Sequence, residues 1–499
     1  MTYFTPPRKG FMHRCISIVA FFVMTLLCNG AMAQTNNEPW AEYDSNTKTL
    51  TFKYGEKPTT PKVGIKIYGN IGENFWPSWN NAASGTSLDY LKPEELTKVV
   101  FDETFKDARP VFCFWWFKGF SSLESIDGLE YLNTSKTVYM GNMFSGCSSL
   151  TKLNLRNFST ESVVGDEDGD YGYGLSNMFS GCTGLTELDL RNFNTKKCCE
   201  FQNMFYGCTN LKTIYVSDNF SMESSKNAVG MFSGCTSLRG AVEYDASNTD
   251  YKSLANYKNG YFSKTYATVG DTKIPLAGEN LFAWELTIAD GSDFSAPEAF
   301  TAKEASYTRD MNNEWGTLCL PYAFTAPSDV EIYGIKTVSE GSITVNLLKG
   351  EIPAGMPVLA YRTSAATSVS FNATNASVVT TPMSGNKLVG AFKVTVVPDD
   401  SYIISKNKFW LSADLNGSGS TGDVRIKGMR AYISGTTPAL SSRQLDITIG
   451  SEVTAIDALN AVANGTAECY DIQGRRLNGL QKGINIVRIG GTTKKIIIE

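Results

Sequence analysis

The chain has 499 residues, of which 42% are hydrophobic and 19% charged, and its formal net charge is −5. This length accommodates two to four domains, and the acidic balance excludes the basic surface that a nucleic-acid-binding protein needs. The single histidine, His13, lies in a leader that we expect to be removed. The mature chain then has no histidine for catalysis or metal binding, which excludes Ser-His-Asp triads and Cys-His dyads.

Residues 1–33 have the pattern of a secretory signal peptide. Three basic residues and no acid accompany a mostly apolar run from Ile16 to Leu27, and Ala31–Ala33 offers a small-x-small cleavage site. A lipoprotein anchored through Cys28 is the alternative, although a leucine stands where a lipobox has a small residue. After cleavage the net charge is −8. No remaining apolar stretch is long enough for a transmembrane helix, so we expect no membrane span.

Residues 34–100 are expected to form an N-terminal β cap. Trp40–Tyr43 and Thr49–Tyr54 alternate apolar and polar residues on either side of a turn at Asp44–Asn46, as the strands of a hairpin do. A stack of repeats exposes an apolar face at each end, and a capping segment is the usual cover for it.

Residues 101–262 contain a repeated phrase, Met-Phe-x-Gly-Cys-x-x-Leu. Four full copies occur, and a degenerate copy precedes them with Phe120 at the cysteine position. A second element, Leu-x-x-Leu-x-Leu-x-x-Phe-x-Thr, follows the phrase at Leu150–Thr160 and Leu185–Thr195, and its leucines alternate as in a short strand. This periodicity predicts a solenoid of about five coils that stack their apolar faces. The cysteines of the full copies are Cys147, Cys182, Cys208 and Cys235.

These cysteines are expected to be free and to point inward. They occupy the same phase of successive coils, and Phe120 replaces one of them, as a buried apolar position tolerates. The nine cysteines that follow the leader are also odd in number. Disulfides between coils are the alternative, because they form readily in exported proteins.

The stretch Met178–Thr195 closely resembles the diagnostic string of BspA-like leucine-rich repeats, MFxGCxxLxxLDLxxFNT. Members of that family are bacterial cell-surface proteins implicated in adhesion. The resemblance therefore implies a leucine-rich repeat fold, a location on the cell surface, and an extracellular protein or glycoconjugate as partner. It names no particular ligand.

The contact residues expected for such a partner are the polar positions beside the strand leucines, because a solenoid presents them along one long face. An ordinary solvated surface is the alternative for the same positions. The residues are Asn154, Arg156, Asn157, Glu187, Asp189, Arg191 and Asn192.

An acidic insertion at Gly165–Gly174 lengthens one repeat. Asp166, Asp168 and Asp170 have the spacing of the first half of a calcium loop, but the sixth and twelfth positions lack the glycine and the glutamate of such a loop. A solvated acidic loop and a calcium site are both open, and no other cofactor is expected.

Residues 263–450 are expected to form an antiparallel β-sandwich. Short runs rich in Val, Ile, Thr, Tyr and Phe alternate with Gly, Pro, Asn, Asp and Ser over this whole region. Six aromatic residues of this region could stack on sugar rings or fill the core. They are Trp284, Trp315, Tyr322, Tyr361, Trp410 and Tyr432.

Residues 451–499 are expected to form a small C-terminal β module. Three strands with turns at Gln473–Gly474 and Gly490–Gly491 fit the pattern. The segments Tyr470–Leu477 and Lys482–Ile489 resemble the C-terminal domain of type IX secretion substrates, which implies export to the exterior of the outer membrane. The tail is short for a complete sorting domain, so a structural β module is the alternative.

Three functions remain in view, and the oligomeric state is undetermined. The first is an adhesin-like surface protein that binds host or neighbouring-cell macromolecules through its solenoid. The second is a glycan-capture protein that uses the aromatics of the sandwich. A carboxylate-pair glycosidase needs no histidine, but no pair of acids stands out by its spacing, so we expect no enzymatic activity.

Overall fold

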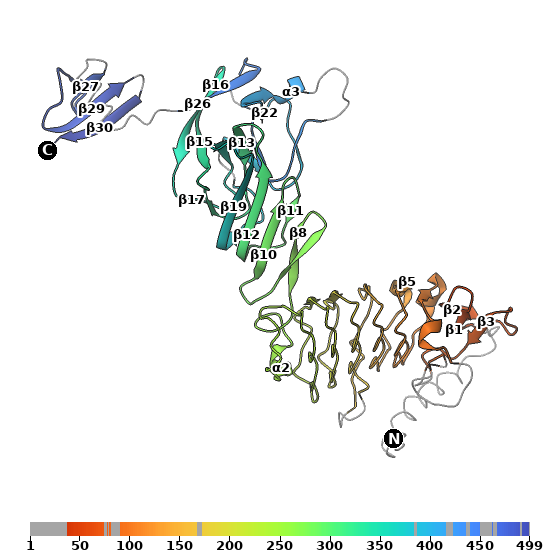
Figure 1. The fold of residues 1–499 in the computed structure, drawn as a ribbon. Coiled ribbons are helices and arrows are strands. Elements are labelled where there is room, and N and C mark those ends of the chain that lie inside the picture. The colour runs from red at the N-terminus through yellow and green to blue at the C-terminus, as the bar shows by residue number, and fades with distance from the viewer. Residues whose placement is uncertain are drawn as a thin grey trace, which may run out of the picture. The chain divides into compact units, whose positions relative to one another are not determined.

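The computed structural model describes residues 37–73, 77, 79–80, 90–166, 172–383, 387–415, 423–435, 440–449, 462, 467–489 and 492–498 (Figure 1). The signal peptide predicted at residues 1–33 lies outside this range. The described chain is mainly β, with α-helices only at α2 (Tyr251–Leu254) and α3 (Ser412–Leu415), so the prediction of a mainly β chain with short helices is confirmed.

The chain divides into two compact units. The first runs to Asn256 and adds Gly260–Phe262, and the second holds Tyr257–Asn259 and the chain from Ser263 onward. Within the described ranges, neither unit contains a helix long and apolar enough to cross a membrane.

The first unit begins with a five-stranded sheet in the order β3-β1-β2-β4-β5. β1 pairs antiparallel with β2 and β3, and β4 lies parallel to both β2 and β5. β4 thus joins the N-terminal hairpin to the chain that follows. The strands are β1 (Asn37–Asp44), β2 (Thr49–Glu56), β3 (Ile65–Tyr68), β4 (Lys98–Phe101) and β5 (Ser125–Asp127), with 3₁₀ helices η2 (Pro93–Glu95), η3 (Glu103–Asp107) and η4 (Leu129–Tyr131).

An aromatic cluster packs this sheet against the first repeat. The ring of Phe52 stacks on Phe101 at 4.6 Å and on Trp116 at 5.3 Å between centroids, and Trp79 meets Phe52 edge-on at 5.2 Å. The indole N–H of Trp79 also donates to the carbonyl oxygen of Trp116 at 2.7 Å. Aromatic packing of this kind buries a large apolar area, so the N-terminal sheet covers the apolar end of the first repeat.

The repeats lie side by side and are joined by hydrogen bonds between their backbones (Figure 1). We call residues 112–240 the repeat stack. The amide of Phe144 donates to the carbonyl of Met178, and the amide of Phe179 donates to that of Met204, both at 2.9 Å. Strands are short here: β6 (Glu187–Asp189) pairs in parallel with β7 (Thr213–Tyr215). The leucine run before Thr160 forms no strand.

The recurring residues of the repeat form three ladders inside the stack. Phenylalanine rings of successive repeats stack at 5.6 to 5.9 Å. All nine cysteines of the described chain are free, and each of the four repeat thiols donates to a backbone carbonyl of the preceding repeat at 2.9 to 3.1 Å. The expectation of free, buried repeat cysteines is therefore confirmed. Threonines form the third ladder: the hydroxyl of Thr195 donates to the carbonyl of Ser221 at 2.8 Å and accepts from its amide at 2.7 Å.

The glycine of the phrase is required by the backbone. Gly146, Gly181, Gly207 and Gly234 all have φ between 70° and 80°, a left-handed conformation that costs a residue with a Cβ atom about 1 kcal/mol or more. A Cβ atom on Gly146 would also lie 3.3 Å from the Cα atom of Gly119 in the neighbouring repeat. Glycine at this position lets the repeats approach each other.

The second unit contains several sheets, most of which are built from strands β8 to β26. One three-stranded sheet has the order β11-β8-β9, and another has the order β10-β12-β19. Their strands are β8 (Thr265–Val269), β9 (Thr272–Leu276), β10 (Phe282–Ala289), β11 (Phe294–Ser295), β12 (Phe300–Asp310) and β19 (Ser368–Val378).

A nine-stranded sheet has the order β13-β18-β15-β16-β26-β23-β22-β25-β20. Two further pairs are β14 (Phe324–Thr325) with β17 (Glu351–Ile352), and β21 (Thr395–Val396) with β24 (Arg425–Ile426). The strands of the nine-stranded sheet are β13 (Trp315–Leu318), β15 (Val330–Ser339), β16 (Ser342–Leu348), β18 (Val358–Arg362), β20 (Leu388–Ala391), β22 (Tyr402–Ser405), β23 (Lys408–Leu411), β25 (Arg430–Ile433) and β26 (Gln444–Ile449).

One buried core is shared by the β10-β12-β19 sheet and by part of the nine-stranded sheet. Leu286 and Phe371 from the former and Ile332 from the latter belong to the same apolar cluster. The pairing is mixed, because β10 runs parallel to β12 and β16 runs parallel to β26. The expectation of a purely antiparallel arrangement is therefore wrong at these two pairs: apolar alternation indicates a strand and its buried face but carries no information on strand direction.

The C-terminal segment of the second unit forms a four-stranded sheet in the order β28-β27-β29-β30. The short strand β28, beyond the turn at Gly474, adds to the three strands expected from the sequence. The strands are β27 (Glu468–Tyr470), β28 (Arg476–Leu477), β29 (Gly483–Ile489) and β30 (Thr492–Ile498).

Candidate binding sites

Two of the predicted contact residues on the repeat stack hold neighbouring repeats together. The side-chain amide of Asn157 donates to the carbonyl oxygen of Glu130 at 2.9 Å, and that of Asn192 donates to the carbonyl oxygen of Leu155 at 2.9 Å. Asn192 also reaches the carbonyl oxygen of Phe158. Each asparagine thus satisfies backbone acceptors of the preceding repeat, which explains its place in the repeat without any ligand.

Two more of the predicted residues neutralise each other. The guanidinium of Arg191 donates to both carboxylate oxygens of Asp189, at 2.9 and 2.6 Å, in a two-pronged ion pair. It also lies over the ring of Tyr215, 5.7 Å from the ring centroid. The pair is partly buried, so a partner would have to compete with these contacts to bind either charge.

The remaining predicted residues lie in two adjacent repeats. Asn154 and Arg156 are exposed, and Glu187 on β6 is half-buried. The side-chain oxygen of Asn154 accepts from the amide of Arg156 at 3.4 Å, and Arg156 itself is exposed. Among the seven predicted contacts, Asn154 and Arg156 are therefore exposed positions with no hydrogen bond to a neighbouring repeat in the described chain.

The acidic insertion is held at its base by a buried glutamate. Glu200 is 1% exposed, and its carboxylate accepts from the amides of Asp166, Gly172, Tyr173 and Gly174 at 2.8 to 3.1 Å. Four amide donors compensate the buried charge.

The predicted calcium ligands are only partly within the described chain. Asp166 is half-buried, while Asp168 and Asp170 lie outside the described residues. One carboxylate oxygen of Asp166 is buried without a hydrogen-bond partner. No group of three or more metal-ligating side chains occurs among the residues that the structure describes.

The aromatic residues predicted for glycan stacking are largely occupied. Tyr322 is fully buried, with its hydroxyl donating to the carbonyl oxygen of Phe371 at 2.7 Å, and Tyr432 is 9% exposed. The ammonium of Lys303 covers the ring of Trp284 at 3.5 Å. Partly exposed rings remain at Trp315, Tyr361 and Trp410, and the first two pack against each other at 4.8 Å between centroids.

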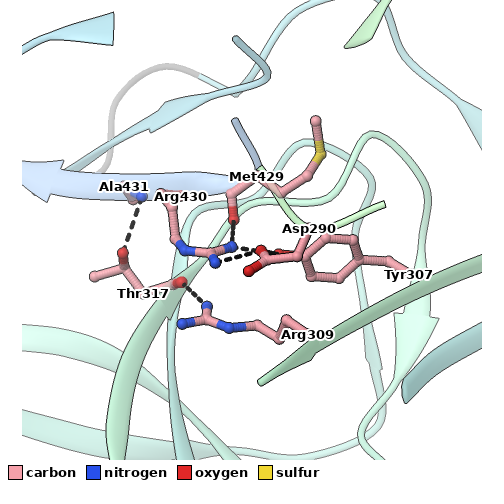
Figure 2. A network of polar contacts seen from close by, with 7 residues as sticks. All are labelled: Asp290, Tyr307, Arg309, Thr317, Met429, Arg430 and Ala431. Atoms are coloured by element: carbon pink, nitrogen blue, oxygen red, sulfur yellow. Dashed lines mark hydrogen bonds and ion pairs between the residues drawn. The ribbon is translucent and has the colours of Figure 1, made fainter. Parts of the chain in front are cut away.

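A polar network in the second unit escaped the sequence analysis (Figure 2). The guanidinium of Arg430 on β25 donates to the carboxylate of Asp290 and to the hydroxyl oxygen of Tyr307 on β12. The hydroxyl of Tyr307 in turn donates to the Asp290 carboxylate at 2.7 Å. Burial raises the pKa of Tyr307 to about 12, which keeps this hydroxyl protonated as a donor. Although burial alone would raise the pKa of Asp290, the Tyr307 hydrogen bond and the charge of Arg430 lower it.

A second guanidinium, that of Arg309, points toward the same region (Figure 2). Its Nη1 donates to the carbonyl oxygen of Thr317 at 2.7 Å, and its Nε is buried without a hydrogen-bond partner. Burial, followed by repulsion from Arg430, lowers the pKa of Arg309 to about 10. Gly316 provides the space, since a Cβ atom there would lie 3.0 Å from Nη2 of Arg309.

These arginines border a cavity of about 230 Å³. The lining includes several positively charged side chains, and Trp315 provides an apolar wall. Arg309 and Arg430 are far apart in the sequence and are brought together by pairing of distant strands, so no local motif marks them. An arginine within a strand is the one signal that the sequence offers, and it is too common to predict a site.

Comparison with known proteins matches one family and no individual protein. Residues 115–247 match a family model described as "Mycoplasma protein of unknown function, DUF285". This segment spans the repeated phrases, so the match concerns the repeat stack and leaves the second unit unassigned. No curated protein and no solved structure matches the chain.

Proposed function

We propose that this protein is an exported, adhesin-like surface protein that binds an extracellular protein or glycoconjugate through its repeat stack. In this proposal the stack is a BspA-like leucine-rich repeat solenoid, and the shared-core sheets of the second unit form a β-sandwich. The leader directs export, and the C-terminal sheet acts as a type IX sorting domain that leads to the exterior of the outer membrane. The protein is not an enzyme.

One observation carries the proposal: the recurring residues form the contacts between repeats, while the exposed positions between them vary. Phenylalanine, cysteine, glycine and threonine each make a contact to the neighbouring repeat. At the position before the leucine of the phrase, in contrast, the copies carry Ser149, Gly184, Asn210 and Ser237, and all of these except Gly184 are exposed. A rigid frame that holds variable side chains in rows is typical of repeat proteins that bind macromolecules.

The localisation is tested by protease shaving of intact producing cells, with mass spectrometry of the released peptides. Peptides from both units should be released without lysis. Release only after the outer membrane is opened would contradict surface display and remove the main support for adhesion.

Binding is tested with fluorescently labelled residues 34–499 on cultured epithelial cells, measured by flow cytometry. Arg156→Glu should lower cell binding several-fold, because it reverses the charge of an exposed predicted contact. Lys196→Glu is the matched control, since it makes the same charge change at another exposed position of the stack. Equal loss in both variants would indicate a general charge effect and oppose a contact at Arg156.

Glycan capture by the second unit is the second candidate, supported by the partly exposed rings of Trp315, Tyr361 and Trp410. A glycan array probed with residues 263–499 separates it from the first candidate. Binding by this fragment, together with cell binding that is insensitive to Arg156→Glu, would favour the second candidate.

A further inference from the structure

The cavity of the second unit carries an excess of positive charge. Arg309, Arg425, Lys427 and Arg430 all line it, and its lining includes no carboxylate. Asp290 neutralises Arg430, while Asp423 lies 3.9 Å from Arg425 and both of these side chains are exposed. At least one guanidinium charge therefore lacks a carboxylate partner in the described part of this unit.

Arg309 is that guanidinium. It forms no ion pair with any described residue, its one hydrogen bond goes to the neutral Thr317 carbonyl, and its buried Nε has no acceptor. Buried charges in proteins are nearly always paired, because removing an ion from water costs several kcal/mol. Arg430 of the same network is itself positive, with a side chain that is 13% exposed, and its repulsion on Arg309 is stronger than the attraction of the Asp290 carboxylate. Arg309 therefore has no anion in direct contact among the described residues.

The rest of the lining indicates what kind of anion fits. Trp315 offers an aromatic wall, and Asn313 and Ser405 offer an amide and a hydroxyl at the same cavity. An aromatic ring suits the C–H face of a pyranose, and amides and hydroxyls suit its hydroxyl groups. The volume of about 230 Å³ is below the range of about 300 to 1,000 Å³ that holds drug-sized ligands, so one small group fits.

We propose that this cavity binds a single acidic sugar residue, with its carboxylate or sulfate group facing Arg309 and its ring against Trp315. The cavity lies within the second unit, so the assignment does not depend on adhesion through the repeat stack; it goes beyond the second candidate, glycan capture, by naming the site and the class of sugar. Arg309 supplies the fork of donors that matches a planar oxyanion.

The test is isothermal titration of residues 34–499 with glucuronate, N-acetylneuraminate, glucose 6-sulfate, neutral glucose and inorganic sulfate. At least one acidic sugar should bind at least about tenfold more tightly than glucose and than inorganic sulfate, as expected for one charge-assisted, two-pronged contact added to ring contacts. Glucose binding equally well would overturn the role of the anion. Sulfate binding equally well would overturn the role of the sugar ring, and no binding of any acidic sugar up to 20 mM would overturn the site.

Two variants locate the binding and one controls for charge. Arg309→Met should weaken acidic-sugar binding about tenfold or more, and Arg425→Met at the exposed rim should weaken it less. Arg443→Met removes the same charge from an exposed pair with Asp414 outside the cavity and should leave the affinity unchanged. If Arg309→Met fails to fold, Arg425→Met and Arg443→Met alone decide: equal affinities in these two variants would count against the site.

Discussion

The sulfur atoms of the repeat cysteines lie in a row inside the stack. Their burial makes the stability of the folded protein depend on pH in a way that exposed groups do not. Burial raises the pKa of Cys208 from 9.0 to about 12, so this thiol stays protonated in the folded state at pH values where it ionises in the unfolded chain. The stability that it contributes is fully present below pH 9 and is lost as the pH rises toward 12.

We therefore expect the free energy of unfolding of the first unit to fall between pH 8 and pH 10.5, by about 2 kcal/mol for this one thiol. Urea unfolding at the two pH values, in the presence of a reducing agent, measures the difference. In Cys208→Ala the stability at pH 8 should be lower because a cavity is left, but the change between the two pH values should be smaller. An unchanged pH dependence in this variant would contradict the assignment.

The threonine ladder predicts a large effect from a small substitution. Thr195 both donates to and accepts from the backbone of Ser221, so Thr195→Val keeps the shape of the side chain but leaves two partly buried backbone groups without these partners. The expected cost is about 2 to 4 kcal/mol, measured by urea unfolding. Thr209→Val, at an exposed position of the next repeat, should change the stability by no more than about 0.5 kcal/mol. Similar losses in both variants would mean that replacing a hydroxyl by a methyl group lowers the stability at any position, and that the hydrogen bonds to Ser221 are not the cause.

At the scale of elements, Glu200 connects the acidic insertion to the repeat that follows it. Its four amide donors include Gly172, Tyr173 and Gly174, and the replacement Glu200→Ala removes all the acceptors at once. The amides of these three residues should then exchange with deuterium at least about tenfold faster, because exchange follows local opening. Hydrogen exchange with mass spectrometry measures this, and Glu161→Ala at an exposed position serves as control. Unchanged protection in Glu200→Ala would show that the insertion is held by other contacts.

Also at this scale, the contrast between sequence and structure follows from the range of each interaction. The repeat ladders were predictable because each ladder residue recurs at a fixed phase, as Cys182 and Cys208 do. The roles of Asn157 and Asn192 were missed. An asparagine that bonds the backbone of the neighbouring repeat and one that only faces solvent look the same in the sequence. The parallel pairing of β10 with β12 was missed because alternation is indifferent to strand direction.

At the scale of the whole molecule, the same limit explains why the cavity of the second unit was not foreseen. Its two central arginines, Arg309 and Arg430, come from strands of different sheets, and only the shared core places them together. The repeat stack depends on contacts between neighbours in the sequence, whereas the second unit depends on pairings such as β16 with β26 that join distant segments. Local periodicity can therefore describe the first unit but not the second.

Because each unit buries its own core, we expect two unfolding transitions in differential scanning calorimetry of residues 34–499. Thr195→Val should lower the midpoint of one transition by several degrees and leave the other unchanged. Thr317→Val should do the reverse, because the buried hydroxyl of Thr317 accepts from the amide of Ala431 at 3.0 Å within the second unit. The two variants control for each other, since both replace a buried threonine by valine. A single transition that both substitutions shift by the same amount would show that the two units unfold cooperatively, and the acidic-sugar cavity could then not be studied apart from the repeat stack.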